Sequence, residues 1–453
     1  MTSIASAADT AAIAARLERL PISRWHIKAR IAVGAVTFFD GFDQLMIAYA
    51  MPKIAKQWHL TTTASGWVIA AGGIGMLIGS LLGGRLADRI GRMPVVIGSM
   101  VLYSLMSLGM AMSSTLALFV VFRFVQGLGL GAEVPVATCY IGEISKARHR
   151  GRFVLLYETI FPVGLLLSSI ASSWVVPHVG YRWLFVTGLI PIVLLPILLR
   201  LPESPRWLTA RGRIADADAA MTRIEQEITA SGKILPPPEP VPAGAPARAA
   251  SLLDLFRGRY LRHTAVIGFT WLTTFFVNYG LTSWLPTLYT GRFHVSLTTA
   301  LHYSVITTLV GVVGCVLVAL LIDGLGRRMS IAFALGLAAA LLFLTAAVAT
   351  GSAFKVMLWC SASSLFVFSV TLALYLYTTE VFPTSMRALG VSFGGACGRL
   401  GAVLGPLLVG WLLDHGALHT LFAIFGAIAL AGALIFGLFA METKEKTLEE
   451  ITA

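Results

Sequence analysis

Six ionisable residues interrupt apolar stretches of this 453-residue sequence that are long enough to cross a membrane. They are Asp40, Asp43, Arg123, Glu133, Glu158 and Arg399. A charge at the centre of a membrane helix costs about 2.5–3.5 kcal/mol even on the mild scales derived from helix insertion. Such residues are retained for a partner or a function, and we therefore treat all six as candidates for proton or anion chemistry.

Asp40 and Asp43 are three residues apart and therefore share one face of a helix. With 1.5 Å of rise per residue, Asp43 lies about 20 Å above the inner membrane surface. Arg123, in a helix that runs the opposite way, lies roughly 19 Å above that surface in a core about 30 Å thick. We expect a carboxylate–guanidinium pair, in which protonation of the aspartate releases the arginine. The pair is either a proton-coupling switch or a static structural contact.

Glu133 and Glu158 lie in the inner third of the membrane by the same arithmetic. We group both with Asp40, Asp43 and Arg123 as candidate proton-coupling residues. For Glu133, a tie to the cytoplasmic gate is equally open. The glycines that precede it, at 127, 129 and 131, and those at 75, 79 and 83 indicate close helix packing.

Arg399 has no acidic residue in the apolar core of its own half of the chain. A guanidinium at mid-depth needs an anion, and a substrate carboxylate matches its fork of donors. Hydrogen bonding to backbone carbonyls is the alternative. The apolar segment centred near residue 275 adds aromatic rings that suit stacking on a flat ring. The candidate substrate-binding residues are Arg399, Tyr279, Asn278, Phe275, Tyr157, Tyr375 and Trp284, although for Trp284 a packing or lipid-facing role is equally open.

Other reaction chemistry is missing from the sequence. It contains no nucleophile–base set, no zinc-ligand motif and no nucleotide-binding loop. We therefore expect no enzyme, no metal and no cofactor other than a coupling ion. Without ATP the available driving force is an ion gradient, and the buried carboxylates favour protons over sodium.

The composition places these residues in a membrane protein. Hydrophobic residues make up 57% of the chain and charged residues 12%, whereas soluble domains carry about 25% charged residues. These values exclude a soluble enzyme, a disordered chain and a secreted disulfide scaffold. The net charge of +12 is spread between apolar stretches instead of forming a patch, which argues against nucleic acid as a partner.

Twelve segments have the roughly 20 apolar residues that a spanning helix needs. They are centred near residues 42, 76, 103, 129, 163, 192, 275, 311, 339, 367, 400 and 429. The sequence predicts an all-α integral membrane protein with a cytoplasmic N-terminal segment (1–29), a six-helix bundle (30–201), a cytoplasmic linker (202–262), a second six-helix bundle (263–441) and a cytoplasmic tail (442–453). The linker carries a helical pattern near residues 215–228 and a proline-rich run at 236–240. Residues 9–20 predict a short amphipathic helix on the membrane surface.

Basic residues set the orientation of the chain. Five Lys or Arg fall in the predicted outer loops, whereas 17 fall in the predicted inner segments other than the long linker. Cytoplasmic loops carry the excess of basic residues, so both termini are predicted to be cytoplasmic.

The two halves carry matching charged motifs. Asp88 and Arg92 recur as Asp323 and Arg327 at an offset of 235, and Glu143 recurs as Glu380 at an offset of 237. Two motifs with nearly one offset indicate duplicated six-helix units, which in transporters hold the substrate at the repeat interface near mid-membrane. We expect salt bridges of a cytoplasmic gate among Asp88, Arg92, Glu143, Arg150, Asp323, Arg327, Glu380 and Arg387.

These motifs resemble those of a known superfamily. The loop Gly84-Arg-Leu-Ala-Asp88-Arg-Ile-Gly91-Arg92 resembles the signature of the major facilitator superfamily. The loop Pro202-Glu203-Ser204-Pro205-Arg206-Trp207 is similar to one in its sugar-porter and organic-ion branches. The leading segment at residues 19–24 and Asp40-Gly41-Phe42-Asp43 are similar to bacterial metabolite:proton symporters for aromatic acids and niacin. The resemblance covers essentially the whole chain.

The resemblance implies a multi-pass transporter of the bacterial inner membrane that imports a small organic anion with protons by alternating access. In related symporters an acid on helix 1 beside an arginine on helix 4 is often the coupling site, and the organic-anion branch carries an arginine on helix 11. Its partners would be the anion, protons and the lipid bilayer, and the expected working unit is a monomer.

The resemblance also orders the substrates. Nicotinate comes first, because the Glu133-Val-Pro135 ending of helix 4 and the Pro-Glu-Ser-Pro-Arg loop look more like those of niacin carriers. The two aspartates of helix 1 look more like benzoate-type carriers, which keeps that substrate open. A sugar or organic-cation carrier is third, and a non-transporting, receptor-like membrane protein of the same fold is the alternative from another class.

Overall fold

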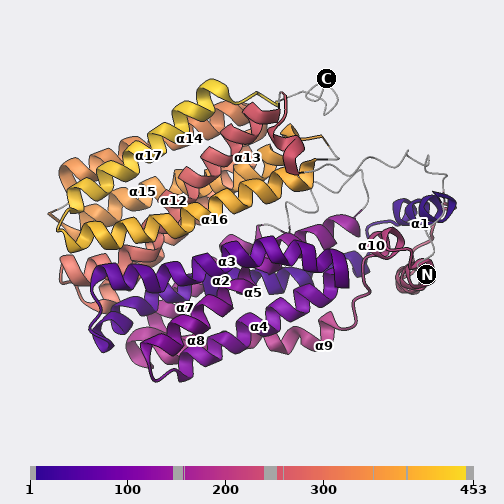
Figure 1. Ribbon diagram of the computed structural model, residues 1–453, viewed down its shortest axis with the longest axis horizontal. Coiled ribbons are helices and arrows are strands. Elements are labelled where there is room, and N and C mark those ends of the chain that lie inside the picture. The colour runs from indigo at the N-terminus through magenta and orange to yellow at the C-terminus, as the bar shows by residue number, and fades with distance from the viewer. Residues whose placement is uncertain are drawn as a thin grey trace.

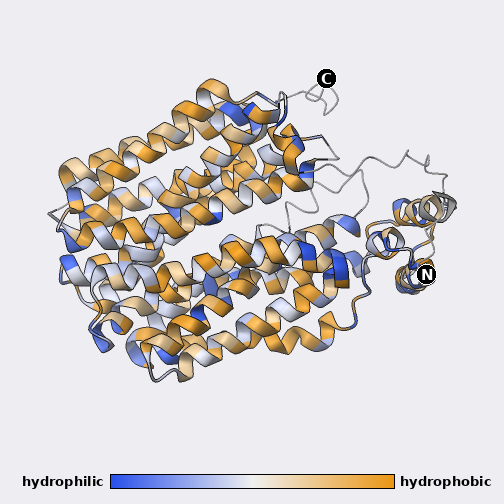
Figure 2. Ribbon diagram, viewed as in Figure 1, coloured by the Kyte–Doolittle hydropathy of each residue, from blue (hydrophilic) through white to orange (hydrophobic). Residues whose placement is uncertain are grey.

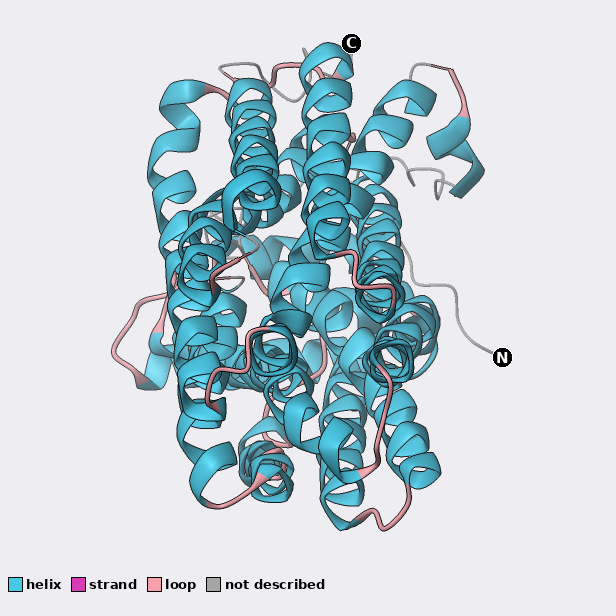
Figure 3. Ribbon diagram, turned by 90° about the vertical axis from the view of Figure 1, so that its left-hand side faces the viewer, coloured by secondary structure: helices cyan, strands magenta, loops and turns pink. Residues whose placement is uncertain are grey.

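The computed structural model describes residues 7–145, 157, 159–238, 252–258, 260–349, 351–383 and 386–444. Over these residues it consists of helices and loops without a β-strand (Figure 3). The long helices lie side by side in two groups, one from each half of the chain (Figure 1). The predicted all-α fold of two six-helix repeats is confirmed.

The first group contains the six spans of the N-terminal half. They are α2 (Arg24–Gln57), α3 (Thr62–Ile90), α4 (Arg92–Met112), α5 (Leu116–Glu143), α7 (Ile160–His178) and a divided sixth span made of α8 (Tyr181–Thr187), η2 (Ile190–Leu194) and α9 (Leu195–Leu198). The sixth span is divided because Pro191 and Pro196 each remove a backbone donor and disturb the helical hydrogen bonds.

The second group contains the six spans of the C-terminal half. They are α12 (Tyr260–Arg292), α13 (Leu297–Leu325), α14 (Arg327–Leu344) with the π-helical turn Thr345–Ala349, α15 (Ala353–Val381), α16 (Arg387–Asp414) and α17 (Leu418–Phe439). The start of α12 meets the end of α17, where Arg262 donates to the carbonyl oxygen of Phe439 at 2.9 Å.

Eleven spans among the described residues are long and apolar enough to cross a membrane. The twelfth, α12, has 33 residues but a lower hydropathy, because many of its buried residues are threonine, serine and asparagine. A span that faces other helices and a cavity tolerates such residues, whereas one that faces lipid does not. Elsewhere apolar residues run along the helices and hydrophilic residues gather mainly at their ends (Figure 2).

Glycines bring helices within each bundle into backbone contact, as the sequence predicts. A Cβ atom on Gly79 of α3 would lie 2.1 Å from the carbonyl oxygen of Leu128 on α5. A Cβ atom on Gly131 of α5 would lie 2.1 Å from the carbonyl oxygen of Met76 on α3. Because helices in a membrane associate through close packing, these positions fix the distance between α3 and α5.

Short helices cover one end of the first bundle. They are α1 (Ala7–Arg19), α10 (Pro205–Ala210) and α11 (Ile214–Ala230). A further short helix, η3 (Leu252–Phe256), lies beside the second bundle. The predicted helix at residues 9–20 is present as α1, and its apolar residues pack on α11; its place on the membrane surface stays a prediction. Its buried side chains Ile13 and Leu17 belong to the same apolar cluster as Ile224 of α11.

Ion pairs hold α1 on α11. Arg16 donates to Glu225 at 2.7 Å and also contacts Asp218, and Arg19 donates to Glu225 at 2.6 Å. Burial of Glu225 would raise the pKa of its carboxyl, but hydrogen bonds from both arginines outweigh this and lower it. We take this end as the cytoplasmic one, which stays a prediction from the distribution of basic residues.

At the opposite end, α3 and α16 join the two bundles. The backbone N–H groups of Thr62 and Thr63, at the start of α3, donate to the Asp414 carboxylate at 3.1 and 2.8 Å. A carboxylate satisfies the free N–H groups and the positive end of the dipole at a helix N-terminus. One turn further on, Gly66 and Gly410 let the helix backbones touch. This end of the interface is therefore closed.

Candidate functional site

A cavity lies between the bundles. Helices from both halves form its walls: α2, α3, α5 and α7 from the first half, and α12, α13, α15 and α16 from the second. The predicted site residues that line it are Asp40, Phe275, Asn278, Tyr279, Tyr375 and Arg399. A cavity at the interface of two repeats is the expected place for a transported molecule.

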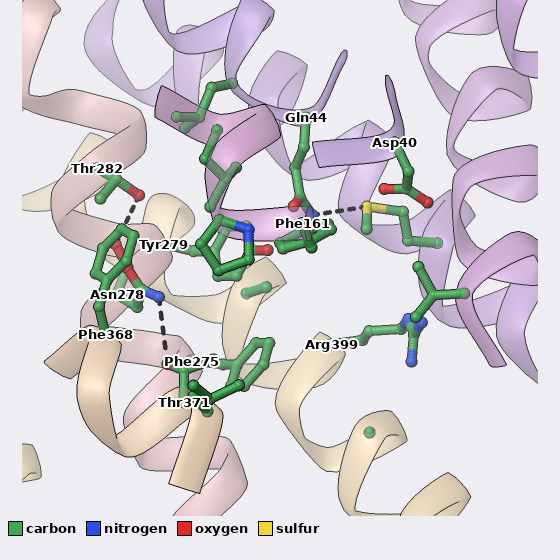
Figure 4. Close-up of a pocket in the computed structure, with 18 of the residues that line it drawn as sticks. Asp40, Gln44, Phe161, Phe275, Asn278, Tyr279, Thr282, Phe368, Thr371 and Arg399 are labelled. Carbon is green, nitrogen blue, oxygen red and sulfur yellow. Dashed lines mark hydrogen bonds between the residues drawn. The ribbon is translucent and has the colours of Figure 1, made fainter. Parts of the chain in front are cut away.

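Asp40 and Arg399 form the charged part of the cavity (Figure 4). Asp40 on α2 is 1% exposed, and neither carboxylate oxygen has a hydrogen-bond partner among the described residues. Arg399 on α16 has one hydrogen bond, from Nη2 to the carbonyl oxygen of Gly131 at 3.4 Å, and its buried Nε has no partner in the described part of the chain. Unsatisfied groups of this kind are costly and mark a binding site or a switch.

The sequence shows no acidic residue for Arg399 in its own half of the chain, and the structure supplies one from the other half. Asp40 comes from the other bundle and lies within electrostatic range of Arg399. The two residues were assigned to separate roles, proton coupling and substrate binding. The structure brings them into one cavity.

Aromatic rings form another wall of the cavity. Trp271, Phe275 and Tyr279 are four residues apart on α12, so they follow one helix face, and adjacent rings stack with centroids 5.1 and 5.7 Å apart. Tyr375 of α15 meets Trp271 edge to face at 4.6 Å. Phe161 and Phe368 line the cavity as well (Figure 4). Such surfaces accept a flat ring between or against them.

Two predicted cavity residues lie elsewhere. Trp284 is buried in an apolar contact, where its indole N–H donates to the carbonyl oxygen of Pro406 at 3.0 Å. Tyr157 hydrogen-bonds Thr37, which in turn donates to Glu133 at 2.9 Å. The predictions that Trp284 and Tyr157 line the cavity are therefore wrong, because spacing along one helix does not tell which side faces the other bundle.

The predicted pair between Asp43 and Arg123 is not direct. The amide of Gln126 lies between them: Arg123 donates to Gln126 at 2.6 Å, and Gln126 donates to Asp43 at 3.4 Å. Ser107 also donates to Asp43 at 3.2 Å. All four residues are buried, so the network holds both charges through neutral groups. The sequence placed Asp43 and Arg123 at one depth but could not show the glutamine between them.

Glu133 is fully buried and accepts the Thr37 hydroxyl, outside the lining of the cavity. Its predicted proton-coupling role stays a prediction. Glu158 and Arg150 lie outside the described residues.

The charged motifs of the two repeats form matching ion pairs. Arg92 pairs with Asp88 at 2.7 Å and with Glu143 at 3.1 Å. Arg327 pairs with Glu380 at 3.0 Å in the second bundle. These pairs tie α4 to α5 and α14 to α15, so each lies within one bundle. Asp323 ends the matching turn on α13, and its side chain is not among those described.

Within the predicted gate set, no ion pair between Glu380 and Arg387 is found among the described residues. Arg387, the first residue of α16, is half-buried, and two of its guanidinium nitrogens lack a partner within the described chain. Glu380 contacts Arg327 and accepts the Thr443 hydroxyl at 2.6 Å instead. Arg387 follows Glu380 by seven residues, but α15 ends at Val381 and α16 begins at Arg387, so the two residues belong to different helices.

Two further acids complete the repeat. Glu203 accepts the backbone N–H of Met93 at 3.1 Å, and Glu442 accepts the N–H groups of Arg327 and Arg328 at 2.9 and 3.1 Å. Each acid follows the last span of its bundle and caps the third. Burial raises the pKa of the Glu203 carboxyl above its usual value, against backbone hydrogen bonds that lower it. Glu203 belongs to the Pro-Glu-Ser-Pro-Arg loop, which the sequence singled out without assigning a role to this glutamate.

Several cavity residues were missed or not assigned from the sequence. Gln44 lies one helical turn after Asp40, so the spacing of helix 1 could have revealed it. Phe161, Thr282, Phe368 and Thr371 carry no such signal, because apolar and hydroxyl residues are common throughout the spans.

Comparisons with known proteins agree with this arrangement. A family model described as "Sugar (and other) transporter" matches residues 29–453. The niacin transporter NiaP of Acinetobacter baylyi is 32% identical over 441 residues, which cover 97% of this chain and 99% of that protein. The gallate transporter of Pseudomonas putida is 30% identical over 422 residues, which cover 92% of each chain.

A solved structure shows the same fold. The xylose transporter XylE from E. coli, in a partially occluded inward-open conformation, superposes with a TM-score of 0.71 at 20% identity over 94% of this chain and 100% of that one. Relatives of this chain are inner-membrane transport proteins. The chain therefore belongs to the sugar (and other) transporter family of the major facilitator superfamily, and it is a multi-pass transporter of the bacterial inner membrane and not an enzyme.

Proposed function

We propose that this transporter imports a small aromatic carboxylate together with protons by alternating access, and that nicotinate is its substrate. One observation carries the proposal. A buried aspartate, an arginine with an unused donor and a stack of aromatic rings converge in one cavity between the bundles.

Arg399 supports an anionic substrate. A carboxylate that enters the cavity loses its water, and only a cation with donors replaces that hydration well. The Nε atom of Arg399 is buried and has no partner among the described residues, whereas its Nη2 has one long bond to a carbonyl oxygen. A planar guanidinium donates hydrogen bonds to both oxygens of a carboxylate at once. An organic cation would be repelled by the same group.

Asp40 supports coupling to protons. The charged part of the cavity has one guanidinium, and it can balance one carboxylate. When Asp40 is ionised, it fills that role from α2; when Asp40 carries a proton, Arg399 is available to a substrate carboxylate. An anion and a proton would then enter together, because the proton neutralises Asp40 and the substrate carboxylate takes its place in balancing the charge of Arg399. This exchange across the bundle interface replaces the direct Asp43–Arg123 switch expected from the sequence.

The buried network of Asp43, Gln126 and Arg123 has a supporting role in this scheme. It lies next to Asp40, whose charge interacts with both Asp43 and Arg123. A change of protonation at Asp40 therefore alters the field on that network, and through it the contacts of α2 with α4 and α5. We propose Asp43 as the second proton-coupling residue.

The shape of the cavity supports a flat ring over a sugar. Stacked rings of α12 form one wall, and a flat ring can lie against their faces. The named relatives transport niacin and gallate, which are both ring acids. Nicotinate comes first because the niacin relative has the higher identity and the fuller coverage. A benzoate-type acid is the second candidate.

Uptake by purified protein in liposomes tests the proposal. Labelled nicotinate should accumulate above its outside concentration when the proton gradient is directed inward, with the outside more acidic. Without a gradient it should only equilibrate. Excess unlabelled nicotinate should compete, whereas nicotinamide, which lacks the carboxylate, should compete poorly. A protein that accumulates no ring acid under any gradient would refute import, and equal competition by nicotinamide would refute the carboxylate contact.

A further inference from the structure

The cavity has a second polar part, remote from its charged one. Figure 4 shows Asn278, Thr282 and Thr371 on the side away from Asp40 and Arg399, with aromatic rings between the two groups. These three residues come from α12 and α15 of the second bundle. A molecule that places a carboxylate at Arg399 and a ring against the aromatic wall would therefore extend toward an amide and two hydroxyl groups.

The Asn278 amide has hydrogen-bonding capacity that the protein does not use. Its side chain is 8% exposed in total, and its one hydrogen bond among the described residues runs from Nδ2 to the Thr371 hydroxyl oxygen at 3.5 Å, which is the long limit for such a bond. A primary amide has two N–H donors and a carbonyl acceptor with two lone pairs. One N–H and the carbonyl oxygen are therefore available to a ligand.

Neighbouring groups hold this amide in place without satisfying it. The Thr371 hydroxyl donates to the carbonyl oxygen of Val367 at 3.1 Å, so its oxygen can only accept from Asn278. The Thr282 hydroxyl donates to the backbone oxygen of Asn278 at 2.7 Å and leaves the side chain free. Leaving a polar group unpaired in a site of low polarity is costly, so a ligand that supplies the missing partner is preferred.

We propose that Asn278 determines specificity by hydrogen bonding to a polar atom on the substrate ring, at the side remote from the carboxylate. The inference rests on the proposed function and narrows its substrate class to ring acids that carry a ring nitrogen or a ring hydroxyl. Nicotinate and benzoate have nearly the same shape and charge, and they differ by one ring atom. Nicotinate has a nitrogen that accepts an N–H donor, whereas benzoate presents a C–H group in its place.

Binding of both acids to purified full-length protein tests this inference. The dissociation constants of nicotinate and benzoate are measured by calorimetry for the unchanged protein and for Asn278→Leu, which keeps the size of the side chain and removes its polarity. The unchanged protein should bind nicotinate about tenfold more tightly than benzoate, as expected for one neutral hydrogen bond. Asn278→Leu should lose this preference by binding nicotinate about tenfold more weakly and benzoate no worse.

Two further variants separate specificity from damage to the cavity. Thr371→Val removes the hydroxyl that orients the amide, so it should shift the same ratio in the same direction by a smaller factor. Leu358→Met changes an exposed residue of α15 outside the cavity without changing polarity, so it should leave the ratio as it is. Benzoate binding to Asn278→Leu reports that the variant is folded.

The possible outcomes distinguish the inference from the proposed function. An unchanged nicotinate-to-benzoate ratio in Asn278→Leu overturns the role of Asn278, even when both acids bind. An equal loss of affinity for both acids overturns it as well, because the side chain would then act on the cavity and not on the ring atom. Failure of the unchanged protein to bind either acid refutes the proposed function itself.

Discussion

Replacement of Arg399 separates the charge of the substrate site from its hydrogen-bond geometry. The guanidinium offers a buried Nε without a partner and an Nη2 with one bond of 3.4 Å, so a substrate carboxylate can accept two hydrogen bonds from it. A hydrogen bond to a charged group contributes about 1.5–3 kcal/mol. Arg399→Ala removes both bonds, and it should weaken nicotinate binding by about 3 kcal/mol or more, which is roughly 150-fold in Kd.

Arg399→Lys keeps the charge and loses the fork. One hydrogen bond to the carboxylate remains, so the loss should be about 1.5 kcal/mol, which is roughly tenfold in Kd. Calorimetry measures the dissociation constant of nicotinate for both variants. Arg292→Ala is a suitable control, because Arg292 is exposed at the end of α12 and its removal changes the net charge by the same amount.

The order of the four affinities decides the question. Unchanged protein and Arg292→Ala should bind equally, Arg399→Lys more weakly and Arg399→Ala most weakly, while all four retain similar melting temperatures. Unaltered nicotinate binding by a folded Arg399→Ala protein would refute the contact between this residue and a carboxylate. A melting temperature that falls only in the Arg399 variants would assign the residue to the packing of α16.

Four other changes have definite expected results. Asp40→Asn mimics the protonated carboxyl, so liposomes should lose accumulation driven by a pH gradient and keep exchange of labelled for unlabelled nicotinate; normal accumulation would contradict coupling at this position. Gly79→Val forces a side chain into the backbone of α5 and should lower the melting temperature strongly, whereas Gly84→Ala, which meets nothing within 4 Å, should leave it unchanged. Arg92→Ala breaks the contacts with α3 and α5 far from the cavity, so it should slow uptake and leave the Kd of nicotinate as it is; a matching loss of affinity would contradict a role in the gate. Asp414→Ala removes the contact between the bundles at the closed end. In a protein whose other cysteines are replaced, a thiol reagent that does not cross membranes should then label the cavity residue Cys315 faster from outside. An unchanged labelling rate would show that the contact does not hold that end closed.

The sequence by itself determined the membrane setting, the helices and the repeat. Apolar segments of spanning length depend on local composition, and a duplicated motif is found from matching residue types at a constant offset. Both can therefore be recognised without knowing any contact. The prediction of α11 from residues 215–228 and of close helix packing at the glycines of α3 and α5 rests on the same local periodicity. Even α12, too polar for a simple hydropathy threshold, was counted from the sequence as the apolar segment centred near residue 275.

The sequence also selected residues that line the cavity, because charge and aromatic character inside an apolar span are rare. Arg399, Asp40 and Tyr279 stood out for this reason, and all three lie in one cavity. Residue type alone was insufficient for Trp284 and Tyr157. A helix buried on several sides offers no apolar face by which to choose a direction, so their orientation depends on which neighbours pack against each side.

Only the tertiary structure decided which residues meet. Asp40 and Arg399 are separated by most of the chain and come from different bundles, so their approach depends on how the bundles dock. Gln126 stands between Asp43 and Arg123 because side-chain length and rotamer set the contact, whereas matching depth shows only that a contact is feasible. Glu380 pairs with Arg327 and not with Arg387 because α14 and α15 pack side by side. Local physics fixes the helices, but contacts between distant helices depend on the packing of the whole chain, which no single segment encodes.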